Sequence, residues 1–129
     1  MNVRKIIIHC SDSDVAAHDD IGVIEDWHIA RGFSQVGYHF VIRKNGEIQR
    51  GRVIGMPGAH CRGHNEDSIG ICLTGKQEFS EKQFSSLVSL VQDLCKSFFL
   101  SPRGDVYPHS HFNSDKTCPN FDIEKLDFY

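Results

Sequence analysis

Three residues of the sequence combine metal-binding side chains with positions at or after predicted extended segments. His9 follows the apolar run Ile6–Ile8. His109 ends a later extended segment, and Cys118 lies in the loop after it. Two imidazoles and one thiolate can form a tetrahedral zinc site whose fourth position stays open to water, which is typical of catalytic rather than structural zinc. Zinc held in this way lowers the pKa of bound water to about 7 and polarises carbonyl groups, so the chemistry indicated is hydrolysis.

Spacing alone leaves open whether these three residues meet. A single histidine at a strand end is more often packed than a ligand, and a single cysteine is usually a small core residue. The elements that carry the three residues therefore decide the matter.

The pattern of apolar, polar and turn residues predicts those elements. The β-branched run before His9 is typical of a strand buried on both faces. Ser80 and Gln83 form a capping box ahead of apolar residues at helical spacing, and Asn45–Gly46 is typical of a hairpin turn. Because strands alternate with helices but include a hairpin, we expect an α/β single domain with a mixed central β-sheet and helices packed on it. The expected strands are 5–9, 37–43, 47–50, 68–73 and 106–109, and the expected helices are 21–31, 81–99 and 122–127.

The composition limits the class of protein. A chain of 129 residues suits one domain, and a net charge of −3 argues against nucleic acid as the main partner, because phosphate binding needs clustered Lys and Arg. No apolar run approaches the roughly 18 residues of a membrane span. The apolar part of the first segment is too short for a signal peptide, and five cysteines, an odd number, fit a reducing compartment. We therefore expect synthesis in the cytoplasm and no membrane partner.

Several short motifs occur along the chain in a fixed order. Together they resemble the type-2 N-acetylmuramoyl-L-alanine amidases, the family of small phage lysozyme-like zinc amidases and the related peptidoglycan recognition proteins. The resemblance covers nearly the whole chain, so it implies a single amidase domain over residues 1–129. The motifs are Ile7–Ser11, Trp27–His28, Arg31–Phe33, Gly37–Ile42, Gly46, Gly51–Arg52, Gly58–His60, Gly63–Asn65, Ser68–Gly75 and Lys116–Pro119.

The resemblance implies a role for each matching residue. His9, His109 and Cys118 would hold Zn²⁺, Tyr38 matches the family's active-site tyrosine, and Lys116 matches the lysine before the ligand cysteine. The implied reaction is hydrolysis of the amide that joins the lactyl group of N-acetylmuramic acid to L-alanine in peptidoglycan. Tyr38 would hydrogen-bond the attacking water, and Lys116 would stabilise the oxyanion that develops on the carbonyl.

The second histidine ligand has a rival in the sequence. The family usually has glycine before this histidine, and here Pro108 stands there. His111 lies two residues after His109, and in an extended chain positions i and i+2 point the same way. We prefer His109, because an acidic residue is usual in the family where His111 stands.

The other histidines and cysteines have weaker assignments. The resemblance places His60 at the groove, where it is a candidate substrate-binding residue, with a structural role as the alternative. His39 follows Tyr38 in a strand and is expected to face the opposite side, whereas His28 is expected on the helix face that packs on the sheet. Three further cysteines lie in apolar patterns and are expected in the core: Cys10, Cys72 and Cys95.

The implied function is zinc-dependent cleavage of peptidoglycan by a phage or prophage endolysin. Such a protein would be made in the cytoplasm, act on the cell wall after release, and work as a monomer. The alternative is a non-catalytic recognition or regulatory module of the same fold that binds muropeptides without cutting them. Non-catalytic relatives typically lack the ligand cysteine, so the presence of Cys118, Lys116 and Tyr38 favours the enzyme.

Overall fold

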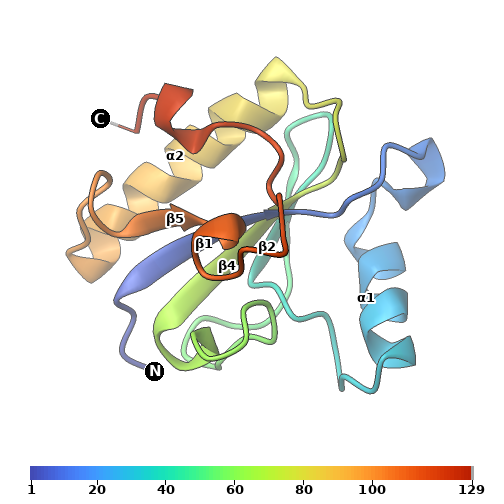
Figure 1. Ribbon diagram of the computed structural model, residues 1–129, viewed down its shortest axis with the longest axis horizontal. Helices are drawn as coiled ribbons and strands as arrows, with labels where there is room; N and C mark the ends of the chain where they lie inside the picture. Colours follow the sequence, from blue (N-terminus) through green and yellow to red (C-terminus); the bar gives the residue numbers. More distant parts are fainter. Residues whose placement is uncertain (129) are drawn as a thin grey trace.

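The computed structural model describes residues 1–128 and contains one five-stranded sheet with two α-helices (Figure 1). The strand order is β3-β2-β4-β1-β5, and only the β2–β3 pair is antiparallel, so the predicted mixed sheet is confirmed. The strands are β1 (Lys5–Cys10), β2 (Phe40–Ile42), β3 (Ile48–Arg50), β4 (Ser68–Leu73) and β5 (Val106–Pro108), and the helices are α1 (Ile21–Ala30) and α2 (Glu81–Phe98).

One face of the sheet forms the main core with α2. The side chains of Ile6 and Ile8 on β1 share a buried cluster with Leu87 and Val91 of α2. The helix begins with the predicted capping box, in which the Ser80 hydroxyl accepts from the Gln83 amide and the Gln83 side chain accepts from the Ser80 amide. The capping box explains why α2 begins at the predicted residue, and the helical spacing of apolar residues explains why it ends within one residue of the predicted limit.

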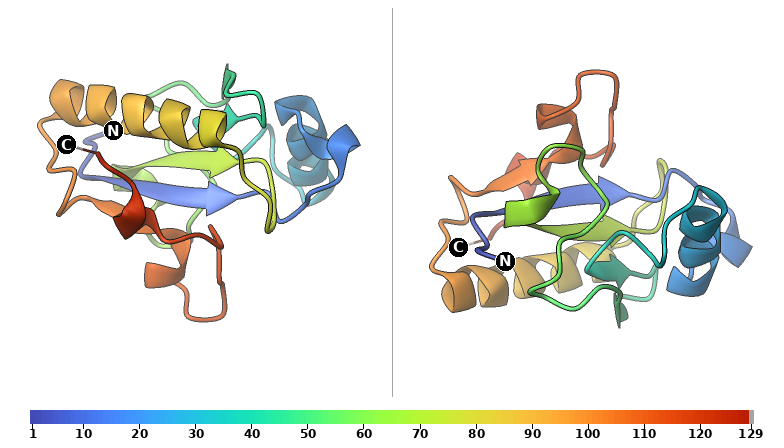
Figure 2. Two further views of the ribbon diagram at one scale, coloured as in Figure 1. Left: turned by 90° about the horizontal axis from the view of Figure 1, so that it is seen from above. Right: turned by 90° about the horizontal axis from the view of Figure 1, so that it is seen from below.

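The opposite face of the sheet carries the polar groups that matter for chemistry. Alternation along β1 places Ile7 and His9 on this face. Near the carboxyl ends of the strands, Val41 and Cys72 form a second buried cluster with Ile24 of α1. Figure 2 shows the segment after β5 on the side of the sheet opposite α2. This segment therefore lies on the same face as His9.

Three predicted elements differ from those observed. The strand expected over 37–43 is confined to β2 (Phe40–Ile42), so Tyr38 and His39 lie before it. The extended segment expected over 106–109 ends at Pro108, and His109–His111 form a 3₁₀ helix, in a loop where the Ser110 amide donates to the carbonyl of Cys118 at 3.0 Å. The terminal helix expected over 122–127 is reduced to the 3₁₀ turn Ile123–Lys125. No helix within residues 1–128 is long and apolar enough to cross a membrane.

Asp14 holds the loop after β4, and we expect it to make the stability of the fold depend on pH in the acid range. Its carboxylate accepts backbone N–H bonds from residues 76–78 and pairs with Lys44 at 3.3 Å. These contacts, led by the Lys76 amide, lower the pKa of Asp14 from 3.8 to about 2. Because the folded-state pKa is the lower one, the stabilisation is present above about pH 4 and is lost as the pH falls through 2.

Thermal unfolding checks this expectation. Asp14→Asn should melt below the unaltered protein at pH 7, and the gap should close as the pH approaches 2. Asp26→Asn, on the exposed surface of α1, is the matched control and should leave the melting temperature unchanged. Equal melting temperatures for Asp14→Asn and the unaltered protein at pH 7 would contradict the assignment.

Candidate metal centre

His9, His109 and Cys118 converge at the carboxyl end of β1. The ligand atoms of the three side chains all lie within 4.8 Å of one another, and the rings of His9 and His109 are 4.4 Å apart between centroids. Strands β1 and β5 are parallel neighbours, so residues that end them meet at the same edge of the sheet. Within residues 1–128 this is the one group of three or more His, Cys, Asp or Glu side chains that could share an ion.

Cys118 is tied to the end of β1 by its sulfur. The backbone amide of Cys10 donates to Cys118 Sγ at 2.8 Å, and Cys118 Sγ donates to the Cys10 carbonyl oxygen at 3.7 Å. Cys10 is 5% exposed, as expected of a core residue, but its contact with Cys118 was not predicted. The adjacency of Cys10 to His9 in the sequence was the only signal for this contact.

Electrostatics favour the neutral form of both imidazoles at the centre. Burial, followed by the neighbouring His60 and His109 rings, holds the pKa of His9 well below its ordinary value. Burial and the charge of Lys116 lower the pKa of His109. Neutral imidazole is the form that binds a metal ion, so both rings are ready to act as ligands near neutral pH.

The thiol of Cys118 behaves differently. The neighbouring Cys10 side chain, followed by burial, raises the pKa of Cys118, so the thiol keeps its proton while no cation is bound. A metal ion would have to displace that proton, which makes binding weaker as the pH falls.

Tyr38 and Lys116 lie beside this cluster. The Tyr38 ring centroid is 5.0 Å from that of His9, and burial raises the pKa of Tyr38 well above its ordinary value, so the phenol stays protonated. Lys116 is exposed, and its charge lowers the pKa of His109. Both residues line the same groove as His109 and Cys118, and the groove is also lined by Cys10, the residue that follows His9.

The groove is a polar, open hollow with a volume of about 770 Å³. Five of its lining residues were predicted from the sequence, but several polar ones were missed. The predicted residues are Tyr38, His60, His109, Lys116 and Cys118. The missed residues come from loops and one short 3₁₀ helix, where no periodic pattern marks a residue for binding: Asp12, Arg31, Arg62, Asn65, Asn113 and Asp115.

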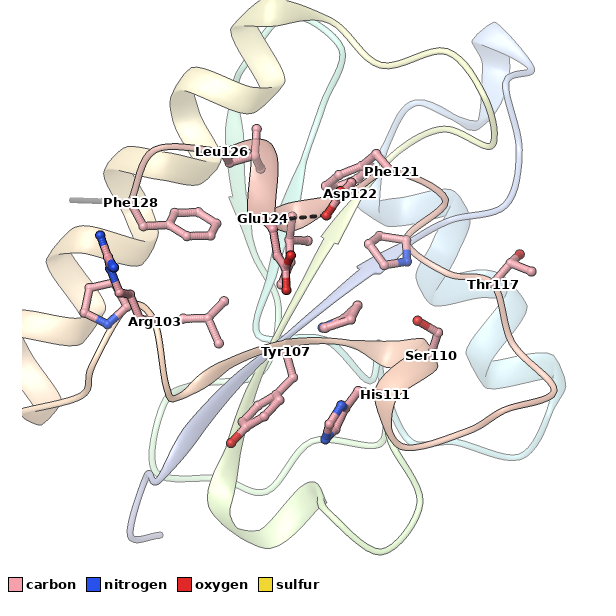
Figure 3. A pocket seen from close by; sticks show the side chains of 15 residues that line it. Arg103, Tyr107, Ser110, His111, Thr117, Phe121, Asp122, Glu124, Leu126 and Phe128 are labelled. Atoms are coloured by element: carbon pink, nitrogen blue, oxygen red, sulfur yellow. Dashed lines mark hydrogen bonds between the residues drawn. The ribbon is translucent and has the colours of Figure 1, made fainter.

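His111 lies away from the cluster. It is exposed, and its ring packs on Tyr107 at 4.8 Å and on Phe112 at 4.9 Å between centroids. Figure 3 shows His111 beside Tyr107 at a second hollow on the outer side of β5. The 3₁₀ turn separates the directions of His109 and His111, so the structure brings His109, and not its rival, to His9.

Three of the remaining histidines are buried: His28, His39 and His60. His60 lines the groove but is only 9% exposed, and both its ring nitrogens have protein partners: Nδ1 lies 2.9 Å from His9 Nε2, and Nε2 lies 3.2 Å from Ser68 Oγ. His39 bonds the Gly70 amide and the Met56 carbonyl. His28 accepts from the Gly37 amide at 2.8 Å and lies against Tyr38.

Comparison with known proteins identifies the family. The family model described as N-acetylmuramoyl-L-alanine amidase matches residues 1–121. The endolysin of Klebsiella phage KP32 is 32% identical over 94% of this chain and 83% of its own length. The solved N-acetylmuramoyl-L-alanine amidase LysC from Clostridium intestinale is 30% identical, with a TM-score of 0.87 over 98% of this chain and 83% of LysC. Drosophila peptidoglycan recognition protein LB is 26% identical, with a TM-score of 0.81 over 98% of this chain and 82% of that protein. The resemblance found in the sequence motifs is thus confirmed, and the chain belongs to the N-acetylmuramoyl-L-alanine amidase family.

Proposed function

We propose that this chain is a zinc-dependent N-acetylmuramoyl-L-alanine amidase of the endolysin type. Its substrate would be peptidoglycan, and the bond cut would be the amide between N-acetylmuramic acid and L-alanine. The observation that carries the proposal is the convergence of two imidazoles and one thiol, at the edge of an open polar groove, in a chain that matches the amidase family. We expect the protein to act on the cell wall as a monomer.

The donor set fits zinc. Nitrogen and sulfur ligands suit Zn²⁺ and disfavour Mg²⁺ and Ca²⁺, which prefer oxygen. Three protein ligands are the number found in catalytic sites, which keep one position for water or substrate. Among the described residues the partner of His9 Nε2 is His60, so we expect Nδ1 to be the nitrogen that binds the ion. A bound zinc ion would supply Lewis acidity toward the scissile carbonyl and a lowered pKa for water.

Two side chains of this protein would assist the hydrolysis. The phenol of Tyr38 keeps its proton and lies against His9, so it can hydrogen-bond and orient the attacking water. The ammonium of Lys116 stands at the groove beside His109, where it can stabilise negative charge that develops on the carbonyl oxygen. The substrate's own polar groups would meet Arg31, Arg62 and Asn113 along the groove walls.

A non-catalytic binding module is the competing function. Such a module needs the groove but has no use for a metal ligand set with a phenol and an ammonium beside it. The presence of Cys118, Tyr38 and Lys116 at one place in the structure favours the enzyme over the module.

Metal removal and restoration test the proposal. Protein stripped by a chelator should release no soluble fragments from dye-labelled peptidoglycan, and added Zn²⁺ should restore release whereas Mg²⁺ should not. Unaltered fragment release by protein shown to be free of metal would contradict the proposed chemistry.

A further inference from the structure

The loop around His60 holds the backbone of this residue in place. The amides of His60 and Cys61 both donate to Oδ1 of Asn65, at 2.8 and 2.9 Å. The loop thereby fixes the direction in which the His60 side chain leaves the chain. That direction leads across β4 toward His9 of β1, 51 positions away in the sequence.

Two glycines leave the space that the His60 ring occupies. A Cβ added to Gly70 in β4 would lie 2.5 Å from His60 Cγ, and one added to Gly58 would lie 2.5 Å from His60 Cδ2. Both distances are shorter than any real contact of a Cβ atom. The ring therefore fills a slot in the middle of the sheet face that any side chain at these positions would close.

The hydrogen bonds around this ring have a determined direction. The hydroxyl of Ser68 lies 2.6 Å from the carbonyl oxygen of His64, which can only accept, so Ser68 donates its one proton there. Ser68 Oγ must then accept from His60 Nε2 at 3.2 Å. A neutral imidazole carries one proton, so in the neutral His60 ring that proton is on Nε2.

The position of the His60 proton also determines the position of the proton on His9. Since His60 Nδ1 carries no proton, it accepts from His9 Nε2 at 2.9 Å. A histidine that binds a metal ion through one ring nitrogen is neutral and carries its proton on the other nitrogen. The single proton of His9 is then on Nε2, and Nδ1 keeps a free lone pair.

We propose that His60 is a positioning residue: through the chain His64 carbonyl–Ser68–His60 it holds His9 in the orientation and tautomer that present Nδ1 to the metal ion. This inference rests on the metal centre of the proposed function and deepens it. Ligand histidines generally donate their second ring nitrogen to a protein group that fixes the ring and raises its basicity. Here the partner is an imidazole, and its own tautomer is set by a buried serine.

Two substitutions of similar size separate this role from mere packing. In His60→Asn the amide oxygen can take the place of Nδ1 and still accept from His9, whereas in His60→Gln the amide reaches the place of Nε2 and leaves His9 without an acceptor. Zinc affinity of the full chain is measured by competition with a chromophoric chelator. We expect His60→Gln to bind zinc about 10–100-fold more weakly, which is typical of removing such a partner, and His60→Asn to stay close to the unaltered protein.

Controls and a second readout keep the test decisive. His18→Gln removes an imidazole that bonds Ser13, outside the groove, and should leave zinc affinity unchanged. In the unaltered, zinc-free protein, nitrogen-15 NMR should show His9 protonated on Nε2, a result that depends on neither peptidoglycan cleavage nor variant folding. A His9 proton on Nδ1, or a folded His60→Gln with unaltered zinc affinity, would overturn the inference. Failure to cleave peptidoglycan with these results intact would instead count against the proposed function alone.

Discussion

Replacing His109 by alanine is expected to abolish tight zinc binding, while the matched variant His111→Ala keeps it. His109 lies against His9 with its ring centroid 4.4 Å away, whereas His111 packs on Tyr107 at the outer side of β5. Loss of a direct ligand should weaken binding by more than the roughly 10–100-fold typical of losing a partner of a ligand. Zinc content after dialysis, measured for both variants together with their melting temperatures, checks this expectation.

The pair of variants is informative because both lose an imidazole from the same 3₁₀ helix. A general effect on the loop would reduce zinc content in both. Retention of zinc by His109→Ala, together with its loss from His111→Ala, would reverse the ligand assignment.

Lys116→Ala should reduce turnover about a hundredfold or more while zinc stays bound. The ammonium lies at the groove next to His109, where it can stabilise charge that appears on the carbonyl only during the reaction. Removal of one such donor typically costs about 10²–10³ in kcat, or about 3–4 kcal/mol. The substitution also removes a positive charge that opposes protonation of His109 but leaves all three metal ligands in place.

Rates on soluble muropeptides, measured with zinc content, separate this effect from metal loss. Lys96→Ala, on the exposed surface of α2, is the control and should keep the full rate. If Lys116→Ala raised KM and left kcat unaltered, Lys116 would hold the substrate without assisting the chemical step.

Features carried by short stretches of sequence could be predicted well. The capping box at Ser80 defined the start of α2, and the β-branched run before His9 defined β1. Asn45–Gly46 marked the turn between β2 and β3, where Gly46 has a positive φ of 88°. In each case the signal and the structure it produces lie within a few residues of each other, so no knowledge of the remaining chain was needed.

The features that could not be predicted depend on contacts between distant segments. His109 reaches His9 because β5 pairs with β1, and nothing near residue 109 indicates that neighbour. The 3₁₀ turn at His109 lies in a loop held by the backbone hydrogen bond between Ser110 and Cys118. Because an extended segment was predicted there instead, His111 remained an alternative ligand. His60 was expected at the groove, but its bond to His9 requires β4 to lie beside β1 and Gly70 of β4 to leave room for the His60 ring.

The most direct test of the proposed amidase is the identity of the bond that it cuts. Purified peptidoglycan is incubated with the zinc-loaded protein, and the products are analysed by mass spectrometry and by labelling of new amino groups. The account predicts peptides that begin with a free L-alanine amino group, and glycan chains whose muramic acid carries a free lactyl carboxyl. New reducing sugar ends, new amino groups on other residues, or peptidoglycan that is bound and left uncut would contradict it.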